Sequence, residues 1–129
     1  MADHACLVCF HSGRCDLDAA AQALARCRLT VLRQGEELAV NYPGGPVLRV
    51  AYVAEDYVAE EAAEIAEGNP LAAALLPCDA RFEILIDDLD ATLQEYSTLF
   101  AVQEALEEAT GGFLFNTWNG LFPGRVCNR

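Results

Sequence analysis

Short runs of hydrophobic residues, separated by turn residues, mark strands in the first half of the chain. Residues 5–10 form an apolar run that ends before Ser12-Gly13, which predicts a buried first strand. Three further segments with strand patterning are 29–33, 37–42 and 47–53. Turns around Gly35 and at Pro43-Gly44-Gly45-Pro46 separate them, so we expect a hairpin followed by a third strand of the same meander.

Apolar residues at intervals of three and four predict helices. The first has Asp16 or Asp18 as its candidate N-cap and ends near Cys27. Residues 55–67 form an amphipathic helix with an acidic outer face, and residues 71–76 add one or two helical turns before Pro77. The longest helix begins with a capping box at Thr92, or with Asp90 as the alternative cap. It ends at Gly111 or Gly112.

The longest helix has its apolar face at four positions: Leu99, Val102, Leu106 and Ala109. Leu93, Tyr96 and Phe100 lie alongside that face. Residues 81–86 alternate cleanly before this helix and predict a half-buried strand, while residues 113–118 predict a strand after it. Asn119-Gly120 is the strongest hairpin signal in the chain.

The predicted order is β-α-β-β-β-α-β-α-β within a single domain over residues 1–129. Hairpins mixed with helices favour an α+β class: a two-layer sandwich with a mainly antiparallel sheet and helices packed on one face. A ferredoxin-like core with additions is one such arrangement.

The net charge of −12 is concentrated in the middle of the chain. Residues 1–50 balance to zero, whereas residues 51–110 hold fifteen acidic side chains against the single Arg81. Such a segment would repel a phosphate backbone, so we expect no nucleic-acid binding. It suits a basic protein partner or simple solubility.

No apolar run is long enough for a membrane helix, and residues 1–4 lack the features of a signal peptide. We therefore expect a cytoplasmic protein with no membrane association. The six cysteines should then be reduced thiols, several of them acting as small buried hydrophobes.

Three carboxylates, Asp87, Asp88 and Asp90, stand where the 81–86 strand gives way to the long helix. Acidic residues cap helix N-termini and favour the positive end of the helix dipole, which is the simplest interpretation. An interaction surface is the second, and a Mg²⁺ or Ca²⁺ site is the third.

Asn116, Trp118 and Asn119 form a second candidate binding group, beside the acidic junction if the two flanking strands pair. A lone Trp near a turn either covers the edge of the core or anchors a partner. Tyr42 and Tyr52 admit the same two interpretations.

A third cluster holds metal-ligating and nucleophilic side chains near the N-terminus: His4, Cys6, Cys9, His11 and Cys15. Cys6 and Cys9 have the spacing of half a zinc knuckle, but a strand would point them to opposite faces. No second such pair completes the site. We therefore expect buried thiols, with no metal and no cofactor, and keep metal binding as the alternative.

The sequence lacks the G-x-S-x-G, P-loop, G-x-G-x-x-G and H-E-x-x-H signatures, so it offers no support for an enzyme. In size, charge and element order the chain is similar to small acidic bacterial α+β proteins, including immunity-type proteins that neutralise basic toxins. We expect a binding or regulatory module for a basic partner. Its alternatives are a small enzyme or metal-binding protein, and a homodimer formed through a sheet edge.

Overall fold

The computed structural model describes residues 4–67 and 78–116. Its elements, in chain order, are β1 (His4–Phe10), α1 (Leu17–Arg26), β2 (Thr30–Gln34), β3 (Glu37–Asn41), β4 (Leu48–Val53), α2 (Asp56–Ala66), β5 (Ala80–Ile86), α4 (Leu89–Gln94), α5 (Tyr96–Thr110) and β6 (Phe113–Asn116). The predicted succession of strands and helices is confirmed, except that the last helix is divided into α4 and α5.

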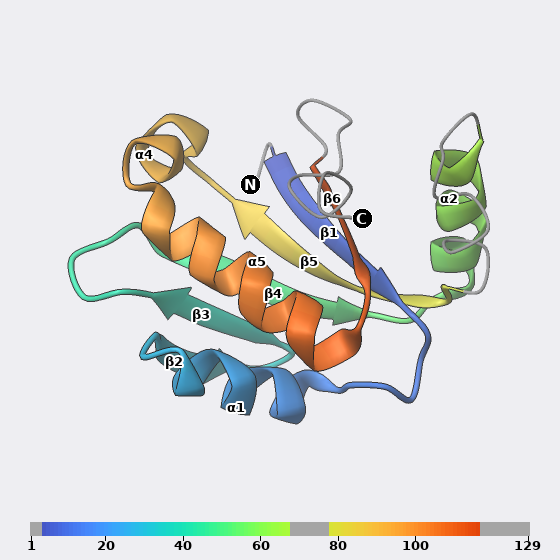
Figure 1. The fold of residues 1–129 in the computed structure, drawn as a ribbon, viewed down its shortest axis with the longest axis horizontal. Coiled ribbons are helices and arrows are strands. Elements are labelled where there is room, and N and C mark those ends of the chain that lie inside the picture. Colours follow the sequence, from blue (N-terminus) through green and yellow to red (C-terminus); the bar gives the residue numbers. More distant parts are fainter. Residues whose placement is uncertain (1–3, 68–77, 117–129) are drawn as a thin grey trace.

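The six strands form one sheet in the order β2-β3-β4-β5-β1-β6, and every neighbouring pair is antiparallel (Figure 1). This confirms the predicted α+β sandwich with an antiparallel sheet. The order of β4, β5, β1 and β6 is compatible with a ferredoxin-like core, to which the β2–β3 hairpin adds two strands. Among the described residues the outermost strands are β2 and β6, and the homodimer through a sheet edge stays a prediction.

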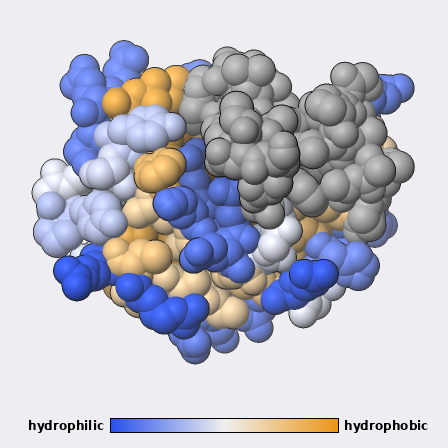
Figure 2. Space-filling view, viewed as in Figure 1, coloured by the Kyte–Doolittle hydropathy of each residue, from blue (hydrophilic) through white to orange (hydrophobic). Residues whose placement is uncertain are grey.

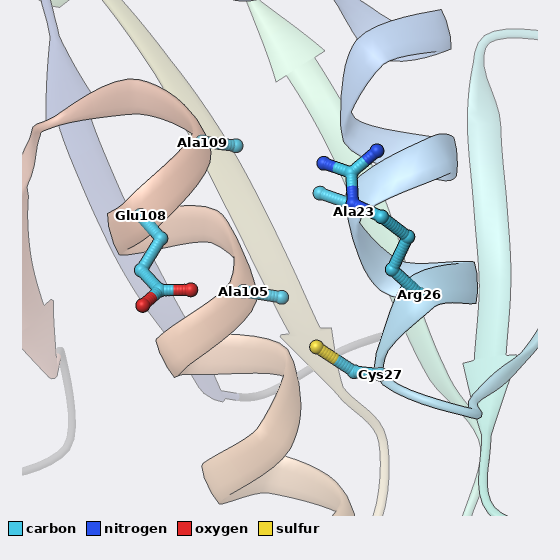
Figure 3. Close-up of a pocket in the computed structure, with 6 residues that line it drawn as sticks. All are labelled: Ala23, Arg26, Cys27, Ala105, Glu108 and Ala109. Atoms are coloured by element: carbon cyan, nitrogen blue, oxygen red, sulfur yellow. The ribbon is translucent and has the colours of Figure 1, made fainter.

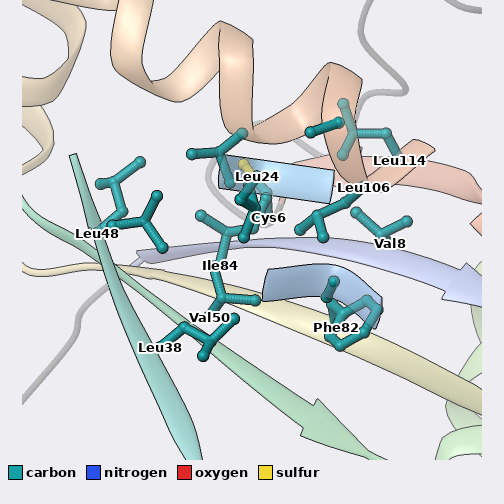
Figure 4. Close-up of a cluster of buried hydrophobic side chains, with 14 of the residues drawn as sticks. Cys6, Val8, Leu24, Leu38, Leu48, Val50, Phe82, Ile84, Leu106 and Leu114 are labelled. Carbon is teal, nitrogen blue, oxygen red and sulfur yellow. The ribbon is translucent and has the colours of Figure 1, made fainter. Parts of the chain in front are cut away.

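The hydrophobic core lies between one face of the sheet and the helices α1 and α5 (Figure 4). Alternate strand residues point to this face, which brings Val8 of β1 beside Phe82 of β5 and Leu114 of β6. Phe82 also stacks on Phe10, with ring centroids 5.2 Å apart, and Tyr52 completes this aromatic group. Tyr52 is thus a half-buried residue that packs against the core.

The N-terminus of α1 and the C-terminus of α5 are capped as the sequence predicts. Asp16 is the N-cap, and its carboxylate accepts a hydrogen bond from the backbone N–H of Ala19 at 2.8 Å. Helix α5 ends at Gly111, whose φ of 68° is the left-handed conformation that favours glycine. Both caps are therefore confirmed.

The opposite face of the sheet is partly covered by α2, whose exposed side carries acidic residues, so the expectation that the helices pack on one face is wrong for α2. Arg81 of β5 points to this face and is only 7% exposed, because its guanidinium contacts Glu61 of α2 and Glu83 of β5 at 2.6 Å each. The expectation of a strand buried on one side only is therefore wrong at Arg81. An ion pair, which hydrophobic alternation does not reveal, buries it.

The predicted capping box at Thr92 is wrong. Asp88 caps α4 four residues earlier, and Thr92 is buried inside that helix. The backbone leaves helical geometry at Glu95, with φ −113° and ψ 77°, and α5 begins at the next residue.

Three predictions lie outside the described residues: the helical turns at 71–76, the Asn119-Gly120 hairpin and the placement of Trp118. No helix in the described ranges is long and apolar enough to cross a membrane.

Candidate functional site

The three carboxylates of the acidic junction do not converge on one point. Asp88 accepts a hydrogen bond from the backbone N–H of Ala91 at 3.0 Å, so capping is confirmed for this residue. Asp87 pairs with Arg49 at 2.8 Å. Asp90 is exposed in the first turn of α4. Over residues 4–67 and 78–116, no group of three His, Cys, Asp or Glu residues is placed to hold a metal ion.

The second candidate group is separated from the acidic junction by a strand. β6 pairs with β1, and β1 in turn pairs with β5, so the two flanking strands do not pair with each other. Asn116 lies opposite Cys6, which in turn lies opposite Ile84. Trp118 and Asn119 are outside the described residues, and a binding role for this group stays a prediction.

The two cysteines of the C-x-x-C spacing point to opposite faces of β1. Cys6 faces the core, where Gln103 Nε2 donates a hydrogen bond to its sulfur at 3.2 Å. Cys9 faces the other side, in the surroundings of Cys78 and the Arg81–Glu61 pair. Burial raises the pKa of each of these two thiols to about 12, which makes both poor nucleophiles and poor metal ligands at neutral pH.

The other members of the N-terminal cluster have separate roles. His4 lies in β1 opposite Ile86. His11 is exposed after the strand, with Nδ1 2.9 Å from the carbonyl oxygen of Ser12. Cys15 is buried, and its sulfur lies 3.4 Å from the carbonyl oxygen of Asp16. The strand and the loop after it thus hold these residues apart.

A shallow groove of about 340 Å³ runs between α1 and α5 (Figure 3). Its floor is made of small side chains, because Ala23 of α1 faces Ala105 and Ala109 of α5. Arg26 and Glu108 stand at its rim, and the half-buried Cys27 points into it. The small residues let the two helices pack closely, which gives this groove a structural explanation.

The most unusual surface of the described chain lies on α4 and the first two turns of α5. Tyr96 and Phe100 are 45% and 53% exposed, and their ring centroids are 6.2 Å apart. Leu93, at 40% exposure, precedes them on α4. We call Leu93, Tyr96 and Phe100 the α4–α5 patch. Figure 2 shows apolar surface over this region, followed along α5 by hydrophilic surface. Single exposed hydrophobic residues are common, whereas contiguous exposed apolar patches mark binding surfaces.

The start of α5, which carries this patch, is held firmly in place. The carboxylate of Glu95 accepts hydrogen bonds from the hydroxyls of Ser97 and Thr98. These bonds, with that from Ser97 the larger influence, hold the pKa of Glu95 below its usual value. The backbone at Gly45 approaches so closely that an added Cβ would lie 2.7 Å from Thr98 Oγ1. The patch therefore rests on a fixed helix start.

Acidic residues continue the exposed side of α5 beyond Phe100. Glu104 follows one turn later, and Glu107 and Glu108 stand in the last turn, which holds no basic residue. Carboxylates at this end of a helix oppose its dipole and cost about 0.3–1 kcal/mol each. Arg14 reaches the same end, because a Cβ added at Gly111 would lie 3.3 Å from its Nη1. The last turn of α5 therefore places carboxylates where the helix dipole disfavours them, with the cationic Arg14 close by.

Sequence patterning placed Leu93, Tyr96 and Phe100 beside the core-facing side, and did not select them as a site. A signal was available. Leu99, Val102 and Leu106 already fill the side of α5 that packs on the sheet. Tyr96 and Phe100 therefore widen the apolar stripe beyond what the core uses.

Comparison of the chain with family models, with curated proteins and with solved structures gave no match.

Proposed function

We propose that this protein is a small cytoplasmic binding module that recognises a basic protein partner. One observation carries the proposal: between Arg81 and Arg125 the chain holds no Arg, Lys or His. The helices α4 and α5 therefore carry acidic side chains and no basic ones of their own. An acidic surface accelerates the approach of a positively charged protein and repels nucleic acid.

The unfavourable charges at the end of α5 support the same function. A bound cationic group would neutralise the exposed Glu108 and remove its repulsion with the helix dipole. The partner would then gain binding energy from the relief of this repulsion. The cytoplasm is the compartment we propose, because the five described cysteines all carry free thiols, which a reducing environment preserves.

The test is capture of partners from a native lysate of the source organism, followed by kinetics with the purified partner. We expect a partner of basic isoelectric point whose association rate falls at least about tenfold between low and high salt. The double variant E104Q/E108Q removes two negative charges from α5 and should slow association. The matched control E60Q/E64Q changes the same charge on exposed residues of α2 and should have a smaller effect.

Three outcomes would contradict this function. The first is that no partner is captured from the lysate at low salt. The second is that E104Q/E108Q and E60Q/E64Q change the association rate equally. Stoichiometric metal in elemental analysis of the purified protein would instead favour the metal-binding alternative.

A further inference from the structure

We infer that the α4–α5 patch is the docking surface, and that its occupant is an amphipathic basic segment of the partner. The segment would place an apolar or aromatic side chain on Tyr96 and Phe100, and Arg or Lys side chains on the carboxylates farther along α5. This inference rests on the proposed function and adds to it the surface and the chemistry of the segment.

The exposed side of α5 is divided into an apolar half and an acidic half. Tyr96 and Phe100 form an apolar first half, and Glu104 and Glu108 form an acidic second half. With a rise of about 1.5 Å per residue, Glu104 lies about 6 Å beyond Phe100 along the helix axis, and Glu108 about 12 Å beyond it. A matching segment therefore carries its positive charges about 6 and 12 Å from its apolar residue. One and two turns of a helix, or two and four residues of extended chain, provide this spacing.

The exposed rings of Tyr96 and Phe100 can bind both parts of such a segment. The exposed faces of aromatic rings attract Arg and Lys as well as apolar groups, so Tyr96 and Phe100 suit both halves of such a segment. Burial of two large side chains that are already about half exposed supplies an apolar contribution that charge alone does not.

Like charge makes a second copy of the chain an unfavourable occupant. Each copy carries a net charge of −12, and α4 and α5 contain no basic residue. Contact between two such surfaces would bring Glu104 and Glu108 near further carboxylates with no cation to pair with them. Charge complementarity thus favours a basic segment.

The helix start is also suited to docking because it is already ordered. Glu95 fixes Ser97 and Thr98, and the close approach of Gly45 leaves little room for the first turn to move. A surface that is ordered before binding loses less conformational entropy when the partner arrives.

The test is selection from a displayed library of random linear peptides on the immobilised protein at low ionic strength. We expect the enriched peptides to combine Arg or Lys with an apolar residue at the spacing given above. Their affinity should fall at least about tenfold with Phe100→Ser and should be largely kept with Phe100→Leu. Leu32→Ser is the matched control, because Leu32 is exposed to a similar extent, 57%, on an unrelated strand.

The outcomes separate the two proposals. If basic peptides are enriched and bind Phe100→Ser as tightly as the unsubstituted protein, the docking surface is wrong and the proposed function stands. If no peptides are enriched, or those enriched carry no positive charge, both are wrong. If sedimentation shows a dimer that Phe100→Ser dissociates, a second copy occupies the patch and the inference fails. Unchanged melting curves for the variants would show that the differences arise from the surface.

Discussion

Arg81 of β5 and Glu61 of α2 are joined by a 2.6 Å contact on the face of the sheet away from α1 and α5. Glu83 shares the same guanidinium, and the Tyr57 ring lies 5.5 Å from it. The contact ties α2 to β5, a strand that begins more than ten residues farther along the chain. The position of α2 therefore depends on a charged group that is almost completely buried.

Replacing Arg81 by Ala should destabilise the protein by about 3 kcal/mol, because it leaves two carboxylates near each other without their partner. Urea unfolding would measure the change in the free energy of unfolding. Arg33→Ala is the control, since Arg33 forms an exposed pair with Asp18 and should lose less than about 1 kcal/mol. Equal losses for the two variants would show that the Arg81 pair has no special role.

Gly112→Ala should also destabilise the fold, by at least about 1–3 kcal/mol. An added Cβ would lie 2.4 Å from the carbonyl oxygen of Cys9 and 3.0 Å from Phe10 Cβ, so β1 and the start of β6 would have to separate. Thermal denaturation of Gly112→Ala, compared with Gly111→Ala, tests this cause. Gly111 needs its left-handed φ but has more room, so its variant should cost less, about 1 kcal/mol.

Alkylation at about pH 8 should modify Cys27 well before Cys6 and Cys9. With the pKa of each buried thiol raised to about 12, only about one molecule in ten thousand carries the reactive thiolate at Cys6 or Cys9. Mass spectrometry of digested samples would give the extent of modification at each residue. In urea the difference should vanish. Rapid labelling of Cys6 in the folded protein would contradict the arrangement described for β1.

The carboxylate of Asp79 should make stability depend on pH in the acid range. The backbone N–H of Ser12, at 2.7 Å, and then its hydroxyl, at 2.9 Å, hold the pKa of Asp79 below its usual value. A depressed pKa contributes stability above the unfolded value of about 3.9, and this contribution is lost as pH falls through the folded value.

Asp79→Asn should therefore lower the melting temperature at pH 7, and its difference from the unsubstituted protein should shrink below about pH 4. Melting curves from pH 2 to 7 would measure it. Glu36→Gln, in the exposed β2–β3 turn, should show no such convergence. If the two melting temperatures differed by the same amount at every pH, the charge of the Asp79 carboxylate would not be what stabilises the protein.

The sequence predicts most of the fold because local signals and tertiary packing agree. The Asp16 cap, the Gly111 stop and the alternation in β5 each depend on neighbours within a few residues. The burial of Arg81 and the order of strands around β1 depend on partners far along the chain. Local sequence patterns therefore do not reveal them. The break at Glu95 was missed because the apolar spacing continues through it.

The candidate site was harder to predict. The acidic cluster in the sequence pointed to Asp87, Asp88 and Asp90. In the structure, Asp88 serves as a cap and Asp87 pairs with Arg49. Tyr96 and Phe100 were placed alongside the core-facing side of the helix and were not selected as a site. Only the packing of α5 on the sheet shows which of its apolar residues are left outside.

The place of β1 in the sheet has a consequence for how the protein folds. β1 is made early, yet both of its neighbours come late: β5 begins at Ala80 and β6 ends at Asn116. During synthesis the three-stranded meander of β2, β3 and β4 can form before β5 and β6, the two partner strands of β1, have been made. Pairings so distant in the chain slow folding. An apolar strand left unpaired for that time is a natural site for aggregation or for chaperone binding.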